Sequence, residues 1–113
     1  MTLVVAYAYL TAAIVFEVIG TVALKASDTF TRLVPSIVTL VAYPACFFFL
    51  ALSLRIIPVG IAYAVWSGIG IVLIALIGWV WFKQALDGPA LLGLGLIIAG
   101  IVVANTFSQS IPH

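Results

Sequence analysis

Charged side chains are scarce in this sequence. Its 113 residues include four Lys or Arg and three Asp or Glu, whereas 66% of the residues are hydrophobic. A soluble domain needs a polar surface, and soluble chains carry roughly 25% charged residues. Most of this surface must therefore face lipid. The formal net charge of +1 also argues against a nucleic acid or an acidic macromolecule as a partner.

Cysteine is nearly absent as well. Cys46 is the single cysteine, which excludes an internal disulfide framework and a multi-cysteine metal site. We expect no metal, no cofactor and no enzyme activity. The first residues lack the basic start and the small-residue cleavage site of a signal peptide, so we expect the first apolar segment to be retained.

What the sequence does contain is long apolar segments, at about residues 3–24, 33–54, 58–82 and 89–107. Each is close to the roughly 20 residues that a helix needs to cross about 30 Å of hydrocarbon. Backbone groups in lipid must be hydrogen-bonded internally, so these segments are helices and not strands. The sequence predicts an all-α membrane protein, with residues 1–113 forming one domain of four transmembrane helices.

Two features bear on how these helices pack. Pro44 interrupts the second apolar segment and predicts a kink there. A bundle of four helices fills its own centre with side chains, so a site that encloses a solute should need a second copy of the chain.

The charged residues other than Glu17 lie between the apolar segments. The first and third loops hold three cations, Lys25, Arg32 and Lys83, whereas the second loop holds Arg55. Orientation follows the Lys/Arg bias of short loops, and the bias here is weak once the terminal amine is counted. The sequence thus permits insertion in both orientations and an antiparallel dimer of identical chains, with a single orientation as the alternative.

Glu17 is the one charged residue inside an apolar segment. An acidic group at this depth costs at least ~2.5 kcal/mol on insertion scales, and such groups are usually functional. The positions at i−7, i−4, i+3 and i+4 share its helical face, and they hold Leu10, Ala13, Gly20 and Thr21. Three of these are small, which favours a recess beside the carboxylate. The alternative is a protonated glutamate that serves as a hydrogen-bonding strut between helices.

The carboxylate of Glu17 has no fixed counter-charge, because no Lys, Arg or His lies at hydrocarbon depth in any segment. Desolvation favours the neutral form of a carboxyl group, and a second Glu17 across a dimer interface would couple the two titrations. We therefore expect Glu17 to hold a proton and to release it when a mobile cation binds.

The third segment places an aromatic pair on one helical face with two small residues, in the order Tyr63, Trp66, Ser67 and Gly70. An indole face attracts cations by about 0.5–2 kcal/mol, and a buried indole N–H needs a partner. Together with Glu17, this face predicts a pocket for an apolar cation, and aromatic core packing is the alternative. Tyr43 and Phe47 on the second segment either extend the aromatic wall or pack in the core.

Glycines suggest two mechanical roles. Gly68 and Gly70 weaken the third helix near its middle, and a bend there would serve alternating access. Gly93, Ile97 and Gly100 share one face of the fourth segment. A smooth face of small residues without ionisable groups is typical of helix association in membranes, so we predict that this face dimerises.

The sequence resembles the small multidrug resistance transporters in four blocks, namely FEVIGT around Glu17, FTRLVPS at 30–36, IPVGIAYAVWSGIGIVLI at 57–74 and ALDGPALLGLGLIIAG at 85–100. The similarity covers nearly the whole chain, with matching order and spacing. It implies proton-coupled antiport of toxic aromatic or quaternary ammonium cations by alternating access. It also implies an antiparallel, dual-topology homodimer in the bacterial inner membrane, whose partners are cationic drugs, lipid and protons as the coupling ion.

Carried over by position, the resemblance makes Glu17 the shared site for proton and substrate, with Tyr63 and Trp66 as its aromatic neighbours. It makes Gly68 and Gly70 the hinge and the fourth segment the dimerisation helix. Gly20 stands where the guanidinium-exporting branch typically has Trp, which indicates the multidrug branch. The residues expected to line the binding chamber are Tyr7, Leu10, Ala13, Gly20, Thr21, Tyr43, Phe47 and Ser67.

Three alternatives stay open at this point. Some relatives work as pairs of unlike chains, so a heterodimer is possible. A small channel would conduct without saturation and without a protonatable Glu17, although no span carries a polar stripe. A lipid carrier or an accessory membrane subunit would also suit a chain of this size, but Trp66 beside a buried glutamate favours aromatic cations.

Overall fold

The computed structural model describes residues 2–107, and four α-helices run through this part of the chain. They are α1 (Leu3–Ala26), α2 (Leu33–Ser53), α3 (Val59–Trp81) and α4 (Gly88–Phe107). Each begins and ends within two residues of an apolar segment predicted from the sequence. All four are long enough to cross a membrane, with a mean hydropathy between 2.0 and 2.2 over their most apolar windows. The prediction of an all-α protein with four membrane-spanning helices is confirmed.

Polar and proline residues fix the starts of the helices. The Thr2 side chain caps α1 by accepting a hydrogen bond from the Val5 N–H at 3.2 Å. Asp87 does the same for α4, where its Oδ1 accepts from the Ala90 N–H at 3.0 Å. Pro58 is the residue before the first turn of α3. These positions suit such residues because the first N–H groups of a helix have no partner within it.

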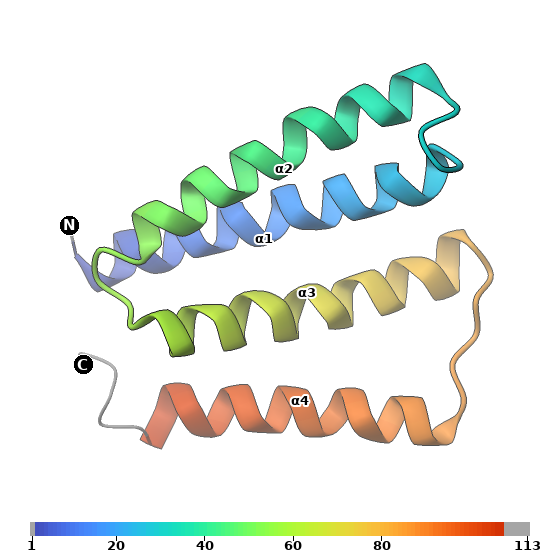
Figure 1. Ribbon diagram of the computed structural model, residues 1–113. Helices are drawn as coiled ribbons and strands as arrows, with labels where there is room; N and C mark the ends of the chain where they lie inside the picture. The colour runs from blue at the N-terminus through green and yellow to red at the C-terminus, as the bar shows by residue number, and fades with distance from the viewer. Residues whose placement is uncertain (1, 108–113) are drawn as a thin grey trace.

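Pro44 does not end the second helix. α2 runs as one element from Leu33 to Ser53 with Pro44 inside it, and its ribbon is unbroken (Figure 1). Pro44 is exposed on the surface of this chain, and the kink expected there stays a prediction.

The loop between α1 and α2 is built around Ser27, which is fully buried. Its Oγ donates to the Leu24 carbonyl at 2.7 Å and accepts from the Phe30 N–H at 3.0 Å. Asp28, Thr29 and Phe30 all have positive φ angles, from 49° to 63°. Such angles disfavour residues with a side chain, so the Ser27 bonds hold a tight, left-handed turn that brings α2 back along α1.

The four helices form a single row in the order α2, α1, α3, α4 (Figure 1). α1 packs against α2 on one side and α3 on the other, and α4 packs against α3. The chain measures 45 × 34 × 16 Å along its principal axes, so the row of helices is a flat layer with two broad faces.

Small residues and one apolar cluster hold the row together. Gly20 of α1 lies against Ala42 and Tyr43 of α2, and the Thr39 hydroxyl of α2 donates to the Gly20 carbonyl at 3.2 Å. Gly68 of α3 lies against side chains of α4. The buried cluster joins α1 to α3 and to Ile57 in the loop before α3, and consists of Ala6, Leu10, Ile14, Ile57, Ala62 and Val65. Small residues let helix backbones approach closely in lipid, where packing replaces the hydrophobic effect.

Candidate functional site

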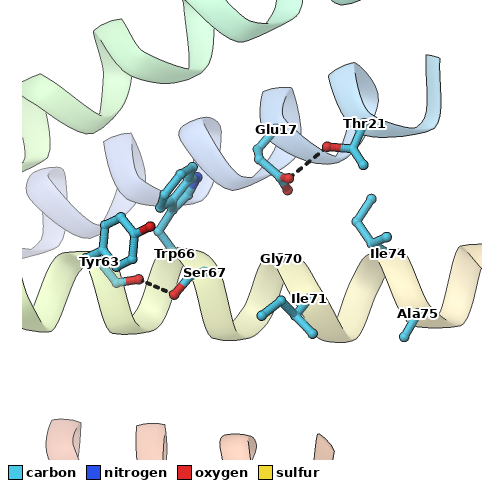
Figure 2. A pocket seen from close by; sticks show the side chains of 9 residues that line it. All are labelled: Glu17, Thr21, Tyr63, Trp66, Ser67, Gly70, Ile71, Ile74 and Ala75. Atoms are coloured by element: carbon cyan, nitrogen blue, oxygen red, sulfur yellow. Dashed lines mark hydrogen bonds between the residues drawn. The ribbon is translucent and has the colours of Figure 1, made fainter. Parts of the chain in front are cut away.

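A cavity of about 460 Å³ lies between α1 and α3 (Figure 2). On α1, the cavity lies nearer the C-terminal end of the helix than the residues of the buried apolar cluster do. Glu17 and Thr21 of α1 form one wall, and a continuous face of α3 forms the other. The lining residues are Glu17, Thr21, Tyr63, Trp66, Ser67, Gly70, Ile71, Ile74 and Ala75.

Glu17 projects from α1 toward α3, and its two carboxylate oxygens have different surroundings (Figure 2). Oε1 accepts a hydrogen bond from the Thr21 hydroxyl at 2.8 Å. Oε2 is buried and has no hydrogen-bond partner in residues 2–107. Lys25, the next cation along α1, is eight residues away, about 12 Å along the helix axis. The site therefore contains a carboxylate with one oxygen left for a proton or a cation.

Gly70 allows the carboxylate to lie against α3. A Cβ atom at this position would stand 3.0 Å from Glu17 Oε2, which is closer than ordinary contacts allow. Gly70 is buried, so a side chain there has no space of its own. The backbone of α3 thus forms the floor beneath the unpaired oxygen.

Tyr43 of α2 is linked to Glu17 through Thr21. The Tyr43 hydroxyl lies 2.7 Å from the Thr21 hydroxyl, which itself bonds to Glu17. Tyr43 does not line the cavity, but the Thr21 hydroxyl connects its hydroxyl to the carboxylate.

Aromatic rings form the other end of the cavity. Tyr63 and Trp66 meet edge to face, with ring centroids 5.2 Å apart and planes at 68°. Phe47 of α2 contacts the outer side of the indole, with centroids 6.2 Å apart. The Trp66 N–H is buried without a hydrogen-bond partner in the described residues, although the buried Cys46 thiol lies beside it. Tyr63 is exposed. Because the faces of aromatic rings attract positive charge, these rings beside the carboxylate suit an apolar cation.

The structure brings together six residues that the sequence singled out. Four are the acid, its threonine neighbour and the aromatic pair, Glu17, Thr21, Tyr63 and Trp66; the other two are Ser67 and Gly70. The Ser67 hydroxyl donates to the Tyr63 carbonyl at 2.6 Å (Figure 2), so its polarity is largely directed into its own helix. Their roles in binding stay predictions.

Other predicted chamber residues lie elsewhere in this arrangement. Leu10 and Ala13 are buried in helix contacts, with 1% and 0% of their surface exposed. Gly20 faces α2. The Tyr7 hydroxyl donates to Asn105 Oδ1 of α4 at 2.7 Å. None of these four lines the cavity of the single chain, and their place in a chamber formed by two chains stays a prediction.

The predicted hinge and dimer residues have distinct surroundings. α3 is one continuous helix through Gly68 and Gly70. A Cβ on Gly68 would meet Ile97 and Ile101 of α4, so this glycine allows close packing of α3 on α4. Ile97 therefore contacts α3 of its own chain. A Cβ on Gly93 or Gly100, in contrast, would have no atom within 4 Å. The hinge and the dimerisation face are not tested by these contacts and stay predictions.

Ile71, Ile74 and Ala75 line the cavity and were not predicted from the sequence. Their signal was available, because they continue the face of Tyr63, Trp66 and Gly70 by one to two further turns of α3 at helical spacing. They make this half of the cavity apolar.

Within residues 2–107 no group of three His, Cys, Asp or Glu side chains is placed to hold a metal.

The family model described as "Small Multidrug Resistance protein" matches residues 5–97. The chain belongs to the small multidrug resistance family. It is 54% identical to "Multidrug transporter EmrE" of Escherichia coli (strain K12), over 95% of this chain and 97% of that protein. It is 52% identical to "Quaternary ammonium compound-resistance protein QacF" of Klebsiella aerogenes, over 93% and 96% of the two chains.

Other bacterial proteins are also similar to this chain over most of their length. "Uncharacterized membrane protein YvaE" of Bacillus subtilis (strain 168) is 46% identical over 88% of this chain. With four membrane-spanning helices and bacterial transporters among its relatives, the chain is a multi-pass protein of the bacterial inner membrane. The resemblance noted from the sequence blocks is confirmed.

Proposed function

We propose that this protein is a proton-coupled antiporter that exports hydrophobic aromatic or quaternary ammonium cations. One observation carries the proposal: the Glu17 carboxylate stands at the wall of an apolar cavity, with one buried oxygen unpaired in the described residues. A buried charge needs a partner. Where the protein supplies no cation, a proton or a cationic substrate can take that place.

The cavity supports the substrate class. Its volume of about 460 Å³ lies within the range of roughly 300–1,000 Å³ that holds small-molecule ligands. Isoleucine side chains offer apolar contact along α3, and the rings of Tyr63 and Trp66 offer attraction to positive charge. A small, strongly hydrated cation would gain little there, whereas a bulky cation with aromatic or alkyl groups matches both the charge and the lining. The names of the relatives, which concern multidrug transport and quaternary ammonium resistance, agree with this class.

The exchange follows from competition for the same oxygens. Protons from the acidic outer face neutralise Glu17 and displace the drug, the protein reorients, and a cytoplasmic drug then displaces the protons. Because both ligands use one charge, no separate coupling device is needed. Exchange of two protons for one monovalent cation moves one net charge, worth about 2.3 kcal/mol per 100 mV of membrane potential.

An antiparallel homodimer is the functional unit in this proposal. The chain is a flat row of helices, so its cavity is open on a broad face, and a second copy would close it and bring a second Glu17 to the site. α4 has no buried residue and carries the uncovered glycines Gly93 and Gly100, which suits it for contact with a partner helix. The weak Lys/Arg bias of the loops permits opposite orientations.

The decisive experiment is uptake of tetraphenylphosphonium into proteoliposomes, driven by an imposed pH gradient. Wild type should accumulate the cation in a saturable way, and Glu17→Gln, which has the same shape but no titratable group, should show none. Gradient-driven uptake that persists in Glu17→Gln would overturn the proposal. Conduction without saturation would favour a channel, and movement of lipid without the cation would favour a lipid carrier.

Proton release offers an independent check. Binding of the cation to purified protein should release protons, which calorimetry detects as a binding enthalpy that depends on the ionisation enthalpy of the buffer. A binding enthalpy that is equal in all buffers at every pH would contradict the exchange scheme.

A further inference from the structure

The hydrogen bonds at Glu17 have a direction. A threonine hydroxyl has one hydrogen, and that of Thr21 donates to Glu17 Oε1 at 2.8 Å. In the contact of 2.7 Å between the hydroxyls of Thr21 and Tyr43, the donor must therefore be Tyr43. The result is an oriented chain across two helices, in which Tyr43 of α2 donates to Thr21 of α1, and Thr21 donates to Glu17.

This chain makes the two carboxylate oxygens unequal. Oε1 already accepts a hydrogen bond, and a proton placed on it would weaken it as an acceptor for Thr21. Oε2 has no partner in the described residues and lies beside Gly70. A proton on Oε2 leaves the bond from Thr21 intact, and a cation at Oε2 does the same. The two ligands of the exchange therefore meet the same oxygen.

The chain also changes the balance between the two forms of Glu17. A hydrogen bond to a charged acceptor is stronger than one to a neutral acceptor, and polarisation of Thr21 by Tyr43 adds to it. An incoming apolar cation must displace the proton from the carboxylate. A donor that favours the ionised form makes this displacement easier, so that a weakly attracted cation can still bind.

We propose that Thr21 and Tyr43 are positioning residues of the exchange site, which hold Glu17 by Oε1 so that Oε2 serves both the proton and the cationic substrate. The inference rests on the proposed exchange at Glu17 and assigns the roles of its neighbours. Neither hydroxyl takes or gives a proton in the exchange itself. Their effect is on the orientation of the carboxylate and on how readily it ionises.

The other titratable groups around the site are few. α2 presents Tyr43 and Cys46, α3 presents Tyr63, and Lys25 lies two turns further along α1. Tyrosine, cysteine and lysine side chains ordinarily titrate above about pH 8. A pH dependence of cation binding below about pH 8 that is lost in Glu17→Gln is therefore assigned to Glu17.

The test is binding of tetraphenylphosphonium to the purified full chain in lipid nanodiscs as a function of pH. Thr21→Val keeps the shape of the side chain and removes the donor. It should move half-maximal binding to higher pH by about one unit, equal to about tenfold weaker binding on the acidic side. Affinity at the alkaline end should stay within about twofold, because the ionised carboxylate still meets the cation. Tyr43→Phe should move the profile in the same direction by less, and Thr21→Ser should restore the wild-type profile.

Thr11→Val is the matched control. Thr11 is also in α1, is exposed, and donates only to the backbone carbonyl of Tyr7 at 2.9 Å. Its loss should leave the profile in place. A Thr21→Val profile that coincides with that of Thr11→Val would overturn the positioning role, while pH-dependent binding in wild type that is lost in Glu17→Gln would leave the exchange intact.

Two outcomes separate the inference from the function it rests on. Binding that does not vary with pH in wild type would contradict the exchange itself. If Thr21→Val binds at no pH, the comparison of Thr21→Ser with Tyr43→Phe decides: a shift in Tyr43→Phe alone supports the oriented chain, and equal profiles for both variants overturn it.

Discussion

α1 and α4 have almost the same hydropathy, with means of 2.0 and 2.2 over their most apolar windows, yet they differ in nearly every contact. α1 lies inside the row, between α2 and α3, and buries five residues, whereas α4 lies at the edge and buries none. α1 also carries the carboxylate of the cavity, and α4 lines no part of it. Hydropathy thus identifies both as membrane spans, and their positions in the row separate a helix that holds a site from one that remains available to a partner.

The strongest test of this comparison is to replace two glycines of α4 with a larger residue. In Gly93→Leu with Gly100→Leu, bulky side chains enter space that is open in the single chain, so each chain should fold normally. Overpacking costs about 1–3 kcal/mol per site, and dimerisation should weaken by roughly a hundredfold. Sedimentation or fluorescence energy transfer in detergent measures this.

Gly95→Leu is the control for that experiment, because it also has open space and lies on the opposite side of α4 by helical spacing. A dimer that survives in the double variant, or is lost equally in the control, would show that α4 does not dimerise through this face.

The α1–α3 contact should be sensitive to a single methyl group. In Gly70→Ala the new Cβ would lie 3.0 Å from Glu17 Oε2 and displace the carboxylate. Cation affinity should fall about tenfold or more, in line with an overpacking cost of about 1–3 kcal/mol. Equilibrium binding measures it, and Gly60→Ala on the same helix, with nothing within 4 Å, should bind as wild type. Normal affinity in Gly70→Ala would mean that the carboxylate does not depend on this close approach.

The α3–α4 contact should respond in stability more than in binding. Gly68→Ala brings a Cβ against Ile101 and Ile97 and should lower the free energy of unfolding by about 1–2 kcal/mol. Adding Ile101→Val makes room and should recover part of this loss, so the two changes should not be additive. Thermal or denaturant unfolding in detergent measures the cycle. Strict additivity would show that the two residues do not touch.

The smallest effect concerns the polar link between the two helices compared above. Tyr7 of α1 donates to Asn105 of α4 at 2.7 Å, and the Asn105 amide donates to the Ile101 carbonyl. Asn105→Leu removes this link and should cost about 0.6 kcal/mol, since hydrogen bonds between membrane helices average near that value. Tyr7→Phe should cost the same, and the double variant no more than either alone. A double variant that loses the sum of both would disprove the bond.

Much of this molecule was accessible from residue order. The four spans followed from apolar length, and the pairing of Glu17 with the Tyr63–Trp66 face followed from helical spacing together with the absence of a counter-charge at that depth. The residues that line the cavity further along α3, such as Ile71 and Ile74, are ordinary apolar residues. Their residue type does not separate them from lipid-facing residues, and only their helical spacing from Tyr63, Trp66 and Gly70 pointed to the cavity.

The contacts of Gly20, Gly68 and Gly70 illustrate the limit. Their spacing suggested a recess and a hinge, but each glycine lies against a different neighbour: α2 for Gly20, α4 for Gly68 and the carboxylate for Gly70. A glycine has the same appearance in a sequence whichever helix approaches it. The partner of Tyr7 was hidden for the same reason, since Asn105 is 98 residues away along the chain.

The sequence by itself determined the solvent of this protein, the number of its helices and the acid that must find a partner in lipid, because these depend on the length of apolar segments and on the cost of burying charge. Only the tertiary structure decided which helices are neighbours, that they form a row, and that one oxygen of Glu17 lies against Gly70 of α3 without a hydrogen-bond partner in residues 2–107. These depend on small differences in packing between helices of nearly equal hydropathy, which composition does not encode.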